Sequence, residues 1–380
     1  MCEIGFPLAS NTLITPRSLL AEIPGKRELL ARGLRFTGGL RLLERTATRW
    51  PALAVFTYHR VLEPAANPFY DPVVSATPDT LGARMDWIKK RFLLPTLNQV
   101  VDQIESGRPW PAPAALVTFD DGTRDNFELA APILAEHGIP AVFFIPTLFL
   151  ESPRLPWWDK LAYLTKQTRA KRFTVSLADG RTLVLDLEIM TRDQAIQALV
   201  QAILAKWITG LDAFFADLTA QARVTLDDER LGRELFMSWD QARELVRGPA
   251  GFTIGSHGHS HPWLAELSAS DQRRELADSR RILEQRLDRG VITVAYPHGG
   301  PDAYTEETKT IAAEVGYRAA FTAIEGVNVQ GAADRFALKR FNCGLSDSVT
   351  LLRTRVALQA VLESLGPQAP CKNPGLRPGL

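Results

Sequence analysis

Short apolar runs alternate with longer segments of helical periodicity along most of this chain. Such runs are typical of buried strands. The predicted strands are Leu53 to Tyr58, Ala114 to Phe119, Ala141 to Ile145, Phe252 to Ser256, Val291 to Tyr296 and Ala319 to Thr322. The predicted helices between them are Phe127 to His137, Asp271 to Leu287 and Thr305 to Val315. Gly138 and Gly316 stand at positions typical of helix C-caps. The alternation predicts a parallel α/β fold.

One long stretch, residues 152 to 237, interrupts this alternation. Its predicted parts are the pair Trp157-Trp158, a hairpin from Phe173 to Leu187 that turns at Asp179-Gly180, and helices over Arg192 to Trp207 and Leu211 to Ala222. Because the insertion follows the end of a strand, we expect it to overhang the active-site face of a barrel. The two tryptophans either stack on the flat faces of a substrate or build the core of the insertion, and the second role is preferred.

The chain before the first strand, residues 1 to 50, is predicted to be a helical segment. Within it, Arg27 to Trp50 has the pattern of one basic amphipathic helix, in which leucines and Phe36 recur among arginines. Such a helix either lies on a membrane or packs over one end of a barrel, and packing is preferred. The barrel domain is expected to span residues 51 to 366, and residues 367 to 380 are expected to be disordered.

Two adjacent carboxylates and a cluster of histidines carry the candidate chemistry. Asp120 and Asp121 end an apolar run, and they repel each other and lose solvation unless a cation or a proton compensates. Three of the six histidines, His257, His259 and His261, follow another predicted strand. The spacing from His257 to His261 places both rings on one side of a helix or tight turn, with His259 as an alternative for either position.

Together these residues indicate a metal-dependent hydrolase. One carboxylate and two neutral imidazoles would hold a divalent ion and leave an open position for water, whose pKa falls to about 7 on zinc. The second carboxylate would then be free to act as the general base. His59, Asp120, Asp121, His257 and His298 each follow or adjoin the end of a predicted strand, which is where barrel enzymes carry catalytic groups.

Three stretches resemble motifs of a known family. They are Thr118-Phe119-Asp120-Asp121-Gly122, the segment from Ser256 to Leu264, and Val294-Ala295-Tyr296-Pro297-His298-Gly299. In order and spacing they resemble the first three motifs of the polysaccharide deacetylases, the NodB-homology group or carbohydrate esterase family 4. The resemblance implies an α/β fold, a distorted, incomplete (β/α) barrel of about seven strands with a large insertion. It also implies a hydrolase of non-peptide carbon–nitrogen bonds that removes N-acetyl groups from amino sugars of a polysaccharide or its precursor.

The resemblance further implies a role for each matching residue. Asp120 would be the general base, and Asp121, His257 and His261 would bind the metal. The ion is expected to be zinc, with cobalt or nickel as alternatives.

The third motif would contribute to the substrate side of the site. The backbone N–H of His298 would stabilise the oxyanion, while its imidazole has no assigned role. Tyr296 and Pro297 are expected at the substrate site.

The chain departs from the family pattern at two points. The arginine that orients the base is replaced by Ala295, and the C-terminal Leu-x-His motif that supplies the general acid is absent after residue 320. The run Tyr58-His59-Arg60-Val61 resembles the opening of exopolysaccharide deacetylases with circularly permuted strand order, so His59 is the expected acid; a histidine with one structural hydrogen bond is the alternative. Arg340 is the candidate for the missing arginine at the substrate site, with a surface arginine as the alternative.

Composition limits the partners and the compartment. The chain has 380 residues and a net charge of +1, which removes any general electrostatic case for nucleic acid or an anionic membrane. An N-acetylated carbohydrate is the expected partner. The three cysteines, Cys2, Cys343 and Cys371, form no disulfide framework or zinc motif. With no signal-peptide pattern and no run of about 18 apolar residues, a cytoplasmic location is expected.

Two other functions stay open. One is a deformylase or amidase on the same scaffold, acting on a small or lipid-linked substrate. The other is a catalytically inactive carbohydrate-binding protein, which the intact pair Asp120-Asp121 disfavours and the missing arginine favours. Acetate release from N-acetylglucosamine oligomers, with and without added metal, would separate the three.

Overall fold

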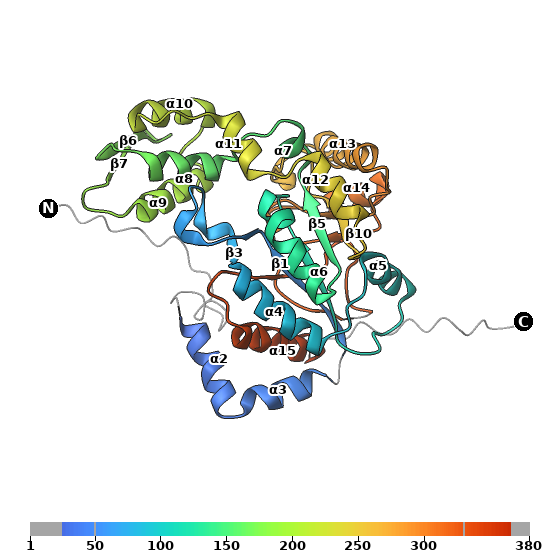
Figure 1. Ribbon diagram of the computed structural model, residues 1–380. Helices are drawn as coiled ribbons and strands as arrows, with labels where there is room; N and C mark the ends of the chain where they lie inside the picture. Colours follow the sequence, from blue (N-terminus) through green and yellow to red (C-terminus); the bar gives the residue numbers. More distant parts are fainter. Residues whose placement is uncertain (1–24, 49–50, 330, 366–380) are drawn as a thin grey trace, which may run out of the picture.

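A curled sheet forms the centre of the protein, as a computed structural model shows for residues 25–48, 51–329 and 331–365 (Figure 1). The strand order is β10-β9-β8-β5-β4-β1-β11, and β12 also pairs with β1. The strands are β1 (Ala52–Tyr58), β4 (Ala114–Phe119), β5 (Ala141–Ile145), β8 (Thr253–Ser256), β9 (Thr293–Ala295), β10 (Ala319–Phe321), β11 (Asn328–Val329) and β12 (Phe341–Asn342). Pairs from β10 to β1 are parallel, and β11 is antiparallel. The predicted α/β fold with a distorted, incomplete barrel is confirmed.

The central strands are buried on both faces, which is why they are continuous apolar runs in the sequence. The predictions for β4 and β5 are correct at both ends. The prediction for β9 is too long by three residues, Val291, Ile292 and Tyr296, and β9 pairs with β8 only at Val294. Periodicity alone does not show where a ladder of hydrogen bonds stops.

A short irregular segment closes the gap between the first and last parallel strands. Leu338 donates its N–H to the carbonyl of Ala320 and accepts the N–H of Thr322, each at 2.9 Å. Three residues later, Phe341 pairs with Phe56 of β1. The segment from Leu338 to Phe341 therefore bridges β10 and β1, and it carries Arg340 into the barrel.

Helices cover the outside of the sheet. Those around the barrel are α4 (Pro78–Arg91), α5 (Leu97–Ser106), α6 (Ala131–His137), α12 (Trp239–Arg247), α13 (Ala269–Leu287), α14 (Glu306–Val315) and α15 (Val349–Leu365). The predicted helices from Asp271 and Thr305 are confirmed as α13 and α14, and Gly316 has the left-handed φ of 99° expected at a C-cap. The helix predicted from Phe127 begins instead as a π-helical turn, Asn126–Ala130, before α6.

The insertion has a hydrophobic cluster of its own and lies beside the sheet at the upper left of Figure 1. Its elements are α8 (Trp157–Gln167), β6 (Arg172–Ser176), β7 (Thr182–Asp186), α9 (Arg192–Leu204), α10 (Leu211–Ala222) and α11 (Asp228–Leu235). The hairpin turns at Gly180, whose φ of 84° suits glycine. The predicted hairpin and helices of the insertion are confirmed. A short helix, α7 (Thr147–Glu151), precedes it.

The N-terminal segment contains two helices rather than the one predicted. Helix α2 (Lys26–Phe36) ends before Gly38, whose φ of 77° is left-handed, and α3 (Gly39–Ala47) begins after it. The glycine permits a sharp turn that a continuous helix cannot make. Both helices pack on α15, as the preferred interpretation predicted. The predicted end of the helix at Trp50 and the predicted disordered tail lie outside the described residues.

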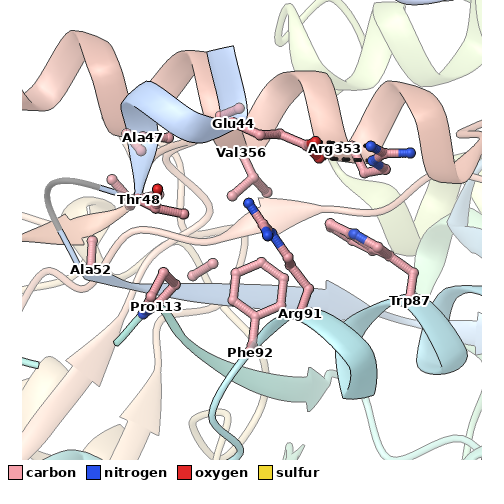
Figure 2. A pocket seen from close by; sticks show the side chains of 14 residues that line it. Glu44, Ala47, Thr48, Ala52, Trp87, Arg91, Phe92, Pro113, Arg353 and Val356 are labelled. Carbon is pink, nitrogen blue, oxygen red and sulfur yellow. Dashed lines mark hydrogen bonds and ion pairs between the residues drawn. The ribbon is translucent and has the colours of Figure 1, made fainter. Parts of the chain in front are cut away.

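An apolar pocket lies where α3 meets α15, α4 and the start of β1 (Figure 2). Ala47, Val356, Trp87 and Phe92 are among its lining residues, and Arg353 of α15 holds α3 through an ion pair with Glu44 at 2.8 Å. Within the described ranges, every helix is too short or too polar to cross a membrane.

Candidate active site

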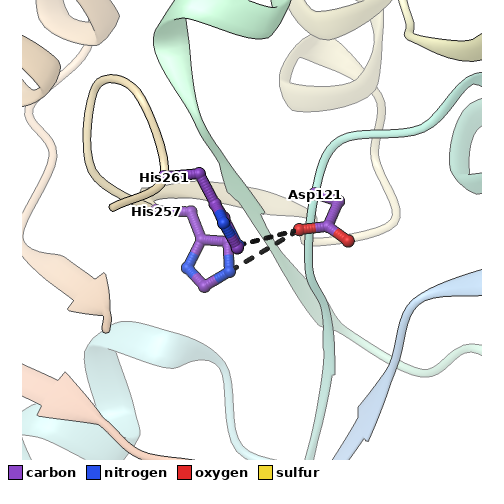
Figure 3. A group of neighbouring side chains, drawn as sticks. All are labelled: Asp121, His257 and His261. Carbon is purple, nitrogen blue, oxygen red and sulfur yellow. Dashed lines mark ion pairs between the residues drawn. The ribbon is translucent and has the colours of Figure 1, made fainter. Parts of the chain in front are cut away.

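One carboxylate and two imidazoles meet at the carboxyl ends of β4 and β8. The Oδ1 atom of Asp121 lies 3.7 Å from Nε2 of His257 and 3.5 Å from Nε2 of His261 (Figure 3). The side chains are 7%, 3% and 7% exposed, respectively, so little water solvates them. One atom from each residue lies within 4.8 Å of the others, which suits a shared divalent cation.

The protonation of this group also suits a cation. Nδ1 of His257 lies 2.7 Å from the carbonyl oxygen of Ala295, which makes Nδ1 the protonated donor and leaves the lone pair of Nε2 directed at Asp121. Burial and the neighbouring His257 hold the pKa of His261 well below its usual range, so its ring is neutral. Oδ1 of Asp121 is buried and has no hydrogen-bond partner. An unpaired buried carboxylate oxygen between two imidazole nitrogens fits a metal site.

The histidine motif is a loop rather than a helix, and its backbone decides which rings face Asp121. Gly258 and His261 have positive φ values of 73° and 64°. His259 points its ring elsewhere, because its Nδ1 lies 2.7 Å from Oγ1 of Thr147 while its N–H donates to Glu275. The ring of His259 therefore does not lie with Asp121, as the alternative prediction for this histidine would require.

Asp120 is held by a buried arginine from the closing segment. Both guanidinium nitrogens of Arg340, NH1 and NH2, donate to its two carboxylate oxygens at 2.8 Å. The Nε of Arg340 donates to the carbonyl of Thr322 at 2.6 Å, and the residue is 1% exposed. Burial by itself would raise the pKa of Asp120, but the charge and hydrogen bonds of Arg340, together with the nearby His257 and His59, outweigh burial and lower this pKa to about 2. The alternative of a surface arginine is wrong.

His59 lies at the end of β1 and lines the same cavity as Asp120 and Asp121. Hydrogen bonds hold its backbone from both sides: its N–H donates to Oγ of Ser75 at 2.9 Å, and its carbonyl accepts from Nδ2 of Asn126 at 2.6 Å. Asn126, which supports this histidine, is not among the residues predicted from the sequence. The only signal was its position five residues after the carboxylate pair, and that spacing does not reveal a partner on another strand.

The third motif lies against the metal group. The ring of His298 stacks on Trp263 with centroids 3.4 Å apart and an angle of 7°. Burial, followed by the neighbouring His261, lowers the pKa of His298 to about 2, so this imidazole is neutral and is not a cationic acid. Tyr296 lines the cavity but donates its hydroxyl to the carbonyl of Phe336 at 3.0 Å. Pro297 packs against Gly258: a Cβ atom added to Gly258 would lie 3.3 Å from Cγ of Pro297.

The insertion supplies one wall of the cavity, which has a volume of about 330 Å³. The lining residues that come from this part are Trp157, Trp158, Val200 and Leu204. The ring of Trp158 makes an edge contact with His261 at 5.4 Å between centroids, whereas Trp157 also packs against the hydrophobic cluster of the insertion. Both proposed roles of the tryptophans are therefore compatible with their positions. Val200 and Leu204 could not be predicted as cavity residues from the sequence, because they continue an ordinary helical pattern.

A buried ion pair joins this wall to the strand that carries His59. Arg60 donates from NH1 and NH2 to the two oxygens of Asp159 at 2.9 and 2.5 Å. Asp159 also accepts the N–H of Tyr70, another cavity residue, at 3.0 Å. Arg60 directly follows His59 in the chain, and Asp159 directly follows Trp158. The ion pair therefore connects the two segments that carry these cavity residues.

Comparisons with known proteins relate this chain to the polysaccharide deacetylases. The sequence model of the family described as polysaccharide deacetylase matches residues 107–172 and 209–320, and the gap between them falls within the insertion. A Bacillus subtilis protein, YxkH, whose name places it among the polysaccharide deacetylases, is 26% identical over 106 residues. That match spans 28% of this chain and 36% of YxkH, so the chain covers about a third of that relative.

Solved structures share the fold at low sequence identity. The Streptococcus pyogenes deacetylase PplD in complex with acetate superposes with a TM-score of 0.53 at 18% identity, over 80% of this chain and 99% of that one. A de-N-acetylase from Aggregatibacter actinomycetemcomitans gives 0.52 at 15% identity, with the same coverage of both chains. The matched family segments contain the carboxylate pair and the histidine motif described above. The chain therefore contains a domain of the polysaccharide deacetylase family, whose members are hydrolases that remove N-acetyl groups.

Proposed function

We propose that this protein is a divalent-metal-dependent deacetylase that removes the N-acetyl group from amino sugars of a polysaccharide or its precursor. The observation that carries the proposal is the convergence of Asp121, His257 and His261 beside an ionised Asp120. Acetate would be one product, and the structure of the Streptococcus pyogenes deacetylase was determined in complex with acetate.

The metal group would consist of Asp121, His257 and His261. A divalent ion bound there, with zinc preferred and cobalt or nickel as alternatives, would supply a Lewis acid for the acyl oxygen and lower the pKa of water to about 7. The carbonyl of Ala295 fixes the tautomer of His257, and burial keeps His261 neutral, so both residues are prepared to be ligands.

Asp120 would take the proton from the attacking water. Its low pKa keeps it ionised at neutral pH, and the two hydrogen bonds from Arg340 fix its orientation. The cost of this arrangement is lower basicity, because a proton moves less readily to a group of low pKa. Arg340 would thus position the base, which is the role that the sequence analysis suggested for it.

His59 would protonate the departing amine, and the backbone N–H of His298 would donate to the oxyanion. The imidazole of His298 is a poor alternative acid because its pKa lies near 2. The reaction adds water across the amide: the acyl carbon gains hydroxyl, and the nitrogen leaves with a proton as a free amine. Tyr296 lines the cavity and would contact the sugar.

Acetate release from N-acetylglucosamine oligomers is the direct test. Protein that has been treated with a chelator should be inactive, and added Zn²⁺, Co²⁺ or Ni²⁺ should restore activity. The Asp120→Asn variant serves as the inactive control because it should retain the ion. Full activity of the metal-free protein would refute metal dependence.

One observation favours a second candidate substrate, a lipid-linked or otherwise amphiphilic precursor. Val200 and Leu204 of α9 present aliphatic side chains to the cavity, and Leu204 is 47% exposed. Sugar rings are recognised by hydrogen bonds and aromatic faces, whereas aliphatic walls suit acyl or prenyl chains. A comparison of methyl and octyl glycosides of N-acetylglucosamine would distinguish the two candidate substrates. If the natural substrate is amphiphilic, Leu204→Ser should lower kcat/KM only for the octyl glycoside.

A further inference from the structure

The outer sides of α2 and α3 expose large apolar side chains in a short stretch of chain. Leu29 is 69% exposed, Leu30 49%, Phe36 94% and Leu42 69%. Exposed leucines are common singly, but a phenylalanine that is almost fully exposed near three exposed leucines is unusual for a protein surface. We call these four side chains the outer apolar face.

Helical geometry places these side chains away from the barrel. Leu29 and Phe36 are seven residues apart, which brings them to the same side of α2, two turns apart. Ala31, the buried residue of α2, is on the opposite side of that helix. In α3, Leu40 is buried and Leu42, two positions on, is turned away from it. Figure 1 shows α2 and α3 at the lower edge of the molecule, with α15 on their inner side.

Side-chain contacts hold the two helices on α15 and leave this face outward. Glu44 of α3 pairs with Arg353, and Oγ of Ser348 donates to Glu28 of α2 at 2.9 Å. Glu28 also pairs with Arg32 at 2.9 Å. Glu28 and Glu44 are the two acidic residues of residues 25–48. Glu44 is therefore paired with α15, and Glu28 is paired with Ser348, directly before α15, and also within α2.

The charge around the outer apolar face is strongly positive. Residues 25–48 contain six basic and two acidic residues, a net charge of +4, whereas the whole chain has +1. Lys26, Arg32, Arg41 and Arg45 are exposed. Local charge, rather than the net charge of the chain, decides attraction at a surface because salt screens charges beyond about 8–10 Å. The small net charge of the protein therefore does not exclude an anionic partner at this face.

We propose that the outer apolar face of α2 and α3 docks on an anionic lipid surface. Exposed leucines and a phenylalanine among basic side chains match the two attractions that hold interfacial helices, burial below the headgroups and contact with anionic lipids. A second copy of this chain fits less well, because a symmetric pair would bring two faces of the same positive charge together. This inference does not depend on the proposed reaction.

Sedimentation with vesicles tests the docking. The full chain should bind vesicles of phosphatidylcholine mixed with phosphatidylglycerol and bind poorly to phosphatidylcholine alone, and added salt should weaken the binding. The double variant Leu29→Ser with Phe36→Ser should lose at least about tenfold in partition coefficient, since each side chain would no longer be buried in the lipid. Ile189→Ser, at a position 86% exposed in the insertion, is the matched control and should bind as the parent does.

The basic residues are tested separately. The double variant Arg41→Gln with Arg45→Gln should reduce binding to the mixed vesicles by about tenfold or more. All variants should keep the parent's acetate release from soluble N-acetylglucosamine oligomers, because these helices lie outside the cavity.

Four results would overturn the proposal. These are equal binding to neutral and anionic vesicles, binding that the leucine and phenylalanine substitutions leave unchanged, and an equal loss of binding in the Ile189→Ser control. The fourth is a dimer of the parent that Phe36→Ser dissolves, because then a second copy of the chain covers the face.

Discussion

Arg340→Met would test whether Arg340, a residue distant in sequence, sets the pKa of the proposed general base Asp120. Methionine keeps much of the length of the side chain but removes the charge and both hydrogen bonds to Asp120. The carboxylate would then be buried without a cation, since Asp120 is 2% exposed. We expect the pKa of Asp120 to rise, because burial, the largest influence on it, raises this pKa and Arg340 is the strongest of the influences that lower it.

The size of the effect follows from the pKa. The shift of the pKa of Asp120 from 3.8 to about 2 corresponds to about 2 kcal/mol in favour of the charged form. Arg340 is the largest of the contributions that lower this pKa, and His257 and His59 add to it. Removing one partner of a buried ion pair costs about 3–5 kcal/mol, and we expect that loss of unfolding free energy at neutral pH.

The pH dependence has a definite sign. In the parent, the folded pKa of Asp120 is depressed, so its stabilising contribution is present above about pH 3.8 and is lost as the pH falls through about 2. In Arg340→Met the folded pKa is raised, so the variant loses stability as the pH rises above about 3.8. The difference in stability between parent and variant should therefore widen from about pH 2 towards neutrality, first because the parent gains stability and, above about pH 3.8, because the variant loses it.

Two measurements check this reasoning. Urea unfolding of the chelated proteins at several pH values gives the stability difference, and kcat/KM against pH for the metal-loaded proteins should show an acid limb displaced upward in the variant. Arg60→Met is the matched control, because it breaks the buried pair with Asp159 and should destabilise the protein without displacing the acid limb. A stability loss under about 1 kcal/mol, or an unmoved acid limb, would refute the role given to Arg340.

The remaining predictions concern the other members of the site. His257→Ala or His261→Ala should abolish binding of one divalent ion per chain, measured by calorimetry; undiminished binding would show that the ligands lie elsewhere. Asp120→Asn should retain the ion but reduce turnover by about 10² or more, and loss of the ion with residual activity in metal excess would mean that the roles of Asp120 and Asp121 are reversed. His59→Ala should slow hydrolysis of an amide far more than of an activated ester, whose leaving group needs little protonation; equal losses on both substrates would count against His59 as the acid.

The sequence by itself determined the local features of this fold. Buried parallel strands must be apolar on both faces, so β4 and β5 could be located to the residue. Left-handed caps favour glycine, so Gly138 and Gly316 indicated two helix ends. The carboxylate pair and the histidine motif were recognisable because each lies within a few neighbouring residues.

The tertiary structure decided which distant groups meet. Arg340 was only one of many arginines until the closing segment placed it against Asp120, 220 residues away in the chain. The loop around Gly258 selected His257 and His261 over His259, and the left-handed turn at Gly38 divided the N-terminal helix. Periodicity and residue type report on the conformation of a few neighbouring residues, whereas these contacts depend on strand order and on backbone direction across the barrel, which no local pattern encodes.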